Sequence, residues 1–90
     1  MEAMRTKVTI KNRLGLHARP AMSFVDTASR FRSTIKLCKG TQAVDGKSIM
    51  QLMMLAATQG TELEITAEGP DAEEAINALQ KLVESGFDDD

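Results

Sequence analysis

The segment GLHARPA, residues 15–21, brings together a histidine, an arginine two residues later and a proline directly after that arginine. A neutral imidazole is nucleophilic, and the ordinary pKa of a histidine, about 6.5, leaves much of it unprotonated at neutral pH. The guanidinium of Arg19 is permanently charged, and its planar donors fit phosphate oxygens. His17 is therefore a candidate covalent acceptor for a phosphoryl group, with Arg19 beside it.

A helix predicted to begin near Pro20 favours the same chemistry. Proline suits the first helical turn because it has no amide hydrogen. The first amides of a helix lack acceptors within the helix and lie at the positive end of its dipole, so they suit an anion. A phosphoryl group on His17 would keep its transfer potential, because the imidazole can be protonated as it leaves. The alternative is that a lone histidine here is only a capping or surface residue.

A second segment of interest, KSIMQLMMLAA at residues 47–57, begins with a serine suited to cap a helix. On a helical wheel its apolar residues cover most of the circumference, which is more than one sheet can bury. Some of them should form an exposed apolar patch, which is typical of a partner surface, and methionine adapts well to several partners. The alternative is a loosely patterned core helix. The run consists of Ile49, Met50, Leu52, Met53, Met54 and Leu55.

Length and composition exclude several classes of protein. Ninety residues predict a single domain over 1–90. A net charge of -2 and the lack of Trp and Tyr argue against nucleic-acid binding. The N-terminal sequence has no long apolar run, so we expect a cytoplasmic protein without membrane insertion. A single cysteine, Cys38, and a single histidine argue against a disulfide and a zinc site, and we expect neither metal nor cofactor.

The apolar pattern predicts the order βαββαβα. Alternation favours strands at 7–11, 33–37, 61–68 and in a short segment ending at Val44, while three- and four-residue spacing favours helices at 20–31, from Ser48 to near Gly60, and after Asp71. Residues 87–90 should be frayed. This order predicts an α+β open-faced β-sandwich, a four-stranded, mainly antiparallel sheet with three helices on one face. A ferredoxin-like domain with an extra helix would have the same pattern.

Three segments, GLHARPA, KSIMQLMML and TQGTELEITAEG, resemble the HPr family, the histidine-containing phosphocarriers of the phosphoenolpyruvate-dependent phosphotransferase system. The similarity runs from Val8 to about Val83. It implies the fold above and a role in sugar transport, in which His17 accepts phosphate on Nδ1 from enzyme I and passes it to an A-type enzyme II component. It also implies that Arg19 assists at the phosphorylation site.

The same resemblance implies that Ile49, Met50 and Met53 are the exposed residues that dock on donor and acceptor. In many HPr proteins the serine that matches Ser48 is phosphorylated by HPr kinase/phosphorylase, and the added charge would oppose docking. NRLGLHARPAM and ESGFDDD resemble the nitrogen-related branch of the family. A regulator that binds transcriptional regulators or metabolic proteins is therefore one alternative, and a plain ferredoxin-like interaction domain is another. A monomer is the default expectation.

Overall fold

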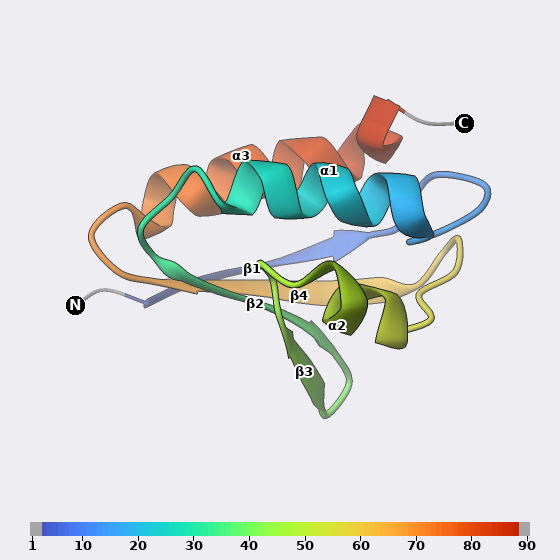
Figure 1. The fold of residues 1–90 in the computed structure, drawn as a ribbon, viewed down its shortest axis with the longest axis horizontal. Coiled ribbons are helices and arrows are strands. Elements are labelled where there is room, and N and C mark those ends of the chain that lie inside the picture. The colour runs from blue at the N-terminus through green and yellow to red at the C-terminus, as the bar shows by residue number, and fades with distance from the viewer. Residues whose placement is uncertain (1–2, 89–90) are drawn as a thin grey trace.

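A computed structural model describes residues 3–88 of the chain as one four-stranded sheet covered by helices. All strand pairs are antiparallel, and the strands lie side by side in the order β1-β4-β2-β3. In Figure 1, α1 and α3 lie next to each other over the sheet, and the shorter α2 lies near β3. The elements are β1 (Ala3–Thr9), α1 (Ala18–Ala28), β2 (Thr34–Lys39), β3 (Gln42–Asp45), α2 (Ile49–Met54), β4 (Glu62–Glu68) and α3 (Ala72–Glu84).

The core lies between the sheet and the helices, as the alternating pattern predicts. Leu63 and Ile65 of β4 are buried, and they lie opposite Val8 of β1 and Leu37 of β2 respectively. Phe24 is the large side chain that α1 contributes to this core. The predicted α+β open-faced sandwich is therefore confirmed.

The first strand differs from its predicted range, 7–11. It begins at Ala3, because β4 continues to Glu68 and pairs with residues 3–6 as well. It ends at Thr9, although Ile10 still donates to the carbonyl of Thr61 at 2.9 Å.

Helix α2 ends at Met54, well before the predicted end near Gly60. The amide of Leu55 donates to the carbonyl oxygen of Leu52, three residues earlier, and Ala56 adopts a left-handed conformation with φ of 50°. The side chain of Lys39 donates to the carbonyl oxygen of Leu55 at 3.0 Å, which satisfies an acceptor that the helix end leaves open. Gly60, with φ of 89°, lies in the turn before β4 and does not cap this helix.

The predicted fraying from Phe87 onward is wrong for Phe87 and Asp88, which belong to a short 3-10 turn, Gly86–Asp88, that follows α3. The side chain of Phe87 is buried. An aromatic ring stabilises the fold strongly when it is buried, which explains why the chain remains ordered here. The predicted fraying of residues 89–90 lies outside the described residues. Within residues 3–88, no helix has both the length and the apolar character needed to cross a membrane.

Candidate functional site

His17 lies directly before the first residue of α1 and is half-buried. Its backbone is extended, with φ of -84° and ψ of -170°, and its carbonyl oxygen accepts from the amide of Ala21 at 3.0 Å. The helix thus begins at Ala18, two residues before the predicted start, and it ends at Ala28, before the predicted end at residue 31. His17 is therefore the residue at the N-terminal cap position of a helix.

The loop before His17 packs against the residues that follow α2. The amide of Leu16 donates to the carbonyl oxygen of Ala57 at 2.8 Å. Gly15 has a φ of 73°, and a Cβ atom built there would lie 2.4 Å from the same oxygen. Only glycine fits this close approach in this backbone conformation. The loop is thereby held in place from both sides, by α1 and by the segment after α2.

The electrostatics at the start of α1 favour a negative charge. Arg19 is the second residue of the helix and is exposed, and the first turn contains no acidic residue to oppose the helix dipole. The amide of His17 already donates to the carbonyl oxygen of Gly15 at 3.0 Å, and Pro20 has no amide hydrogen. An anion at this helix start would therefore meet the positive end of the dipole and the backbone of the first turn of α1.

Helix α2 carries the exposed apolar residues that its sequence predicts. The exposed fractions are 79% for Met50, 45% for Met53 and 38% for Ile49, while Leu52 is fully buried. Met54 is also exposed, at 68%. These four exposed residues, Ile49, Met50, Met53 and Met54, form what we call the methionine patch.

Two more exposed apolar side chains flank His17, and the sequence did not assign them to a surface. Leu14 is 59% exposed in the loop before His17, and Met22 is 52% exposed on α1. The exposure of Met22 could be predicted from helical spacing, because Met22 lies outside the buried stripe that contains Ala21 and Phe24. The exposure of Leu14 depends on the conformation of the loop, so it could not be predicted from the apolar pattern.

Ser48 caps α2, as predicted. Its hydroxyl oxygen accepts from the amide of Gln51 at 3.3 Å, and the side chain is half-buried. The side-chain oxygen of Gln51 in turn accepts from the amide of Asp45 at 2.9 Å. The serine thus stands at the edge of the methionine patch with a structural role of its own.

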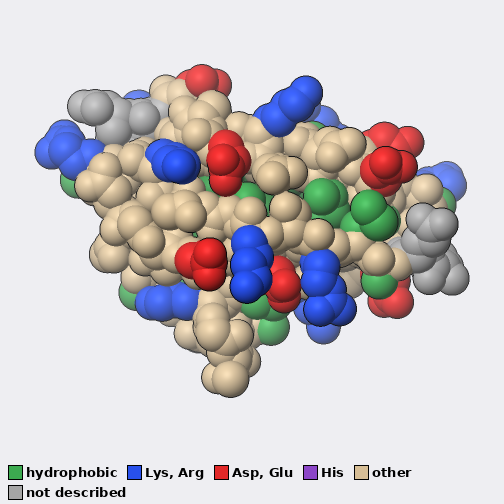
Figure 2. Space-filling view, turned by 180° about the vertical axis from the view of Figure 1, so that it is seen from behind, with side chains coloured by type: hydrophobic (Ala, Val, Ile, Leu, Met, Phe, Trp, Pro, Cys, Tyr) green, Lys and Arg blue, Asp and Glu red, His purple; other side chains and the backbone are tan. Residues whose placement is uncertain are grey.

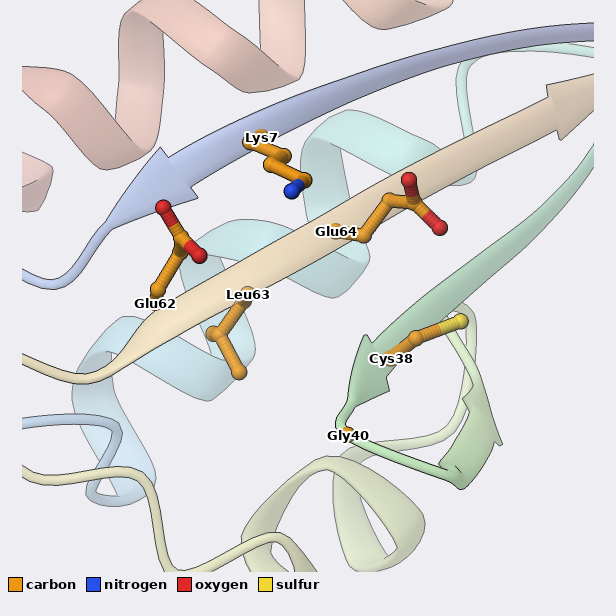
Figure 3. Close-up of a pocket in the computed structure, with 6 residues that line it drawn as sticks. All are labelled: Lys7, Cys38, Gly40, Glu62, Leu63 and Glu64. Carbon is orange, nitrogen blue, oxygen red and sulfur yellow. The ribbon is translucent and has the colours of Figure 1, made fainter.

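A hollow on the open face of the sheet is separate from this arrangement. It lies opposite the helices, and Figure 3 shows the side chain of Lys7 extending from β1 toward β4, between Glu62 and Glu64. Burial and the nearby Glu64 raise the pKa of the Cys38 thiol, which also lines this hollow. From behind, Figure 2 shows basic and acidic side chains intermixed over the surface. No cluster suited to hold a metal ion occurs among residues 3–88.

Comparison with known proteins gives one consistent result. Residues 4–85 match the family model described as "PTS HPr component phosphorylation site". The chain is 46% identical to phosphocarrier protein HPr of Pseudomonas aeruginosa, over 92% of this chain and 93% of that protein. It is 45% identical to phosphocarrier protein NPr of Proteus mirabilis, over 93% and 94% respectively. The crystal structure of HPr from Thermoanaerobacter tengcongensis superposes with a TM-score of 0.92 at 48% identity, covering 97% of this chain and 98% of that one.

Proposed function

The chain belongs to the HPr family of phosphocarrier proteins, and from this premise we propose that it carries a phosphoryl group on Nδ1 of His17. It accepts the group from phospho-enzyme I and passes it to an A-type enzyme II component. The observation that carries the proposal is the position of His17 at the start of α1, with Arg19 in the same helical turn.

Each transfer exchanges one bond to phosphorus for another. The lone pair of the neutral imidazole attacks phosphorus, and the bond to the donor's leaving group breaks. In the second transfer the imidazole of His17 is itself the leaving group, and protonation of the ring assists its departure. The start of α1 and the guanidinium of Arg19 would stabilise the equatorial oxygens, since phosphoryl transfer depends mainly on positioning and charge.

The methionine patch is our proposed docking surface for donor and acceptor, with Ile49, Met50 and Met53 at its centre. These apolar side chains are exposed next to one another on one helix, and such a contiguous apolar patch is typical of a protein-binding surface. The patch is continuous along the chain with Ala57, whose carbonyl holds the His17 loop. A partner seated on α2 would therefore be brought close to the histidine. We place this reaction in the cytoplasm and expect the carrier to act as a monomer.

Ser48 is a proposed regulatory site within the same surface. A phosphate on its hydroxyl would add about -1.5 to -2 charges next to the methionine patch. The helix start tolerates this charge, whereas an acidic partner surface would be repelled. The proposed modifying enzyme is HPr kinase/phosphorylase.

A regulatory role is the second candidate, because the chain is about as similar to a phosphocarrier protein NPr as to a phosphocarrier protein HPr. The identity to the Proteus mirabilis NPr is 45%, next to 46% for the Pseudomonas aeruginosa HPr. In this alternative His17 is phosphorylated in the same way, and the carrier acts mainly by binding regulatory or metabolic proteins. Rates of phosphorylation by a sugar-type and a nitrogen-type enzyme I, measured side by side, would separate the two branches.

The decisive experiment is incubation with phosphoenolpyruvate and enzyme I, followed by mass measurement. We expect the mass of one phosphoryl group to be added, and we expect acid to remove it, as is typical of a phosphoramidate. His17→Ala should abolish the adduct, with Ser48→Ala as a control that retains it. An adduct that persists in His17→Ala would contradict the proposal.

A further inference from the structure

We propose that Asn12 is a positioning residue for phosphorylation of His17, an inference that rests on the proposed function. Asn12 precedes the histidine by five residues and is only 3% exposed. Its side-chain amide donates to the carbonyl oxygen of Gly15 at 2.7 Å. The backbone of Asn12 also accepts from the amide of Gly15 at 3.2 Å. Two hydrogen bonds therefore join the same two residues and close the loop into a ring.

The carbonyl oxygen of Gly15 connects Asn12 to the histidine. It accepts from the side chain of Asn12 and also from the amide of His17, at 3.0 Å. The orientation of this carbonyl fixes where the backbone of His17 leaves the loop and enters α1. The side chain of Asn12 thus determines the placement of the imidazole without contacting the phosphoryl group.

The surroundings of Asn12 indicate that its amide group, and not its volume alone, matters. Its side-chain oxygen is buried and has no hydrogen-bond partner in the structure of residues 3–88, which costs free energy. A Cβ atom built on Gly86 would lie 3.9 Å from the Cβ of Asn12, so the C-terminal turn helps to enclose it. An apolar residue would avoid the unsatisfied oxygen, but only the amide can hold the carbonyl of Gly15.

The test measures phosphorylation by enzyme I and phosphoenolpyruvate, with the carrier as the varied substrate. Asn12→Ala should lower kcat by about tenfold, the effect of losing one well-oriented hydrogen bond, while KM stays unchanged because the methionine patch is intact. Asn12→Leu, which fills the same space without a donor, should be as slow as Asn12→Ala. Recovery of the wild-type kcat in Asn12→Leu would overturn the inference, since it would show that Asn12 only fills space.

Ser33→Ala is the matched control, because Ser33 is also a buried polar residue and hydrogen-bonds to Asp71, outside the His17 loop. It should leave kcat unchanged. A loss of kcat in Ser33→Ala equal to that in Asn12→Ala would show that Asn12 contributes only to the stability of the fold. Hydrogen exchange of the His17 amide should quicken in both Asn12 variants but not in Ser33→Ala. If the wild-type chain is phosphorylated on His17 and the Asn12 variants match its kcat, only this inference fails. If the wild-type chain accepts no phosphate, the proposed function fails.

Discussion

The carboxylate of Asp71, at the start of α3, accepts a hydrogen bond from the hydroxyl of Ser33 at 2.6 Å. The same carboxylate accepts from the amides of Arg32 and Ser33, at 2.8 and 2.9 Å. These bonds join the segment before β2 to the start of α3. They favour the charged carboxylate and lower the pKa of Asp71 to about 2, chiefly through the hydroxyl of Ser33.

We predict that this carboxylate makes the stability of the fold depend on pH in the acid range. An unfolded aspartate has a pKa of about 3.9, so the unfolded chain takes up the proton first as pH falls. The stabilisation is fully present above pH 4 or so and is lost as the pH falls toward 2. Asp71→Asn should lower the Tm at pH 7 and reduce the loss of Tm between pH 5 and pH 2.5, measured by thermal unfolding.

Asp26→Asn, at an exposed position on α1, is the control for this measurement. It should leave both the Tm at neutral pH and its acid dependence close to wild type. A pH dependence in Asp71→Asn equal to that of the wild type would show that other carboxylates produce it.

Much of the fold could be predicted from the sequence, because its signals are local. Alternation in β4 marks the face that Leu63 and Ile65 bury, and Ser48 is a capping residue wherever a helix follows it. The contacts that join distant segments of the fold, and those that hold the His17 loop, are not local. Asp71 and Ser33 are 38 residues apart, and the carbonyl of Ala57 meets the amide of Leu16 only in the folded chain.

Two of the differences from prediction, the early end of α2 and the order at Phe87, have the same origin. The apolar pattern continues past Met54, but the helix stops there, where Lys39 from β2 bonds the carbonyl of Leu55 and Ala56 turns left-handed. Phe87 stands among small and acidic residues, a composition typical of a frayed end, yet the core has room for its ring. In both places a tertiary contact overrides the local preference.

We predict that Phe87→Ala destabilises the fold by about 3 kcal/mol, because it removes a buried aromatic ring. The free energy of unfolding, measured in urea, reports this loss directly. Phe87→Leu keeps most of the apolar volume and should lose much less. A loss below about 0.5 kcal/mol in Phe87→Ala, the range of ordinary surface substitutions, would contradict the burial of this side chain.

The cap and the proposed switch at Ser48 can be separated by two substitutions. Ser48→Ala removes the acceptor for the amide of Gln51 and should cost about 1 kcal/mol of stability, with little effect on phosphorylation of His17. Ser48→Asp retains a good cap and should keep the stability, but its charge should slow phosphorylation by enzyme I. A wild-type rate in Ser48→Asp would argue against the switch.

The methionine patch should control the affinity for enzyme I. Met50 is its most exposed residue, so Met50→Asp should not disturb the core. A charge at the centre of an apolar interface is costly, and we expect the KM for the carrier to rise about tenfold or more. Asn77→Asp adds the same charge at an exposed position on α3 and should leave KM unchanged. An equal rise of KM in both variants would indicate that the net charge of the carrier, and not docking on the methionine patch, controls the affinity.

The close approach of Gly15 to Ala57 gives the sharpest test of how the His17 loop is held. Gly15→Ala would place a Cβ atom 2.4 Å from the carbonyl oxygen of Ala57, so the loop would have to move. Gly40 also has a positive φ, 59°, but a Cβ atom there meets nothing within 4 Å. Both substitutions carry the backbone cost of a left-handed alanine, about 1 kcal/mol, and only Gly15→Ala adds a clash.

We therefore expect Gly40→Ala to lower stability slightly and to accept phosphate at the wild-type rate. Gly15→Ala should lose more stability and should also be phosphorylated more slowly, because displacement of the loop changes the orientation of His17 at the start of α1. The difference between the two variants isolates the packing of the loop from backbone strain. If the two variants were phosphorylated equally fast, the contact with Ala57 would not position the histidine, and the loop would have to be held by its own turn and by α1.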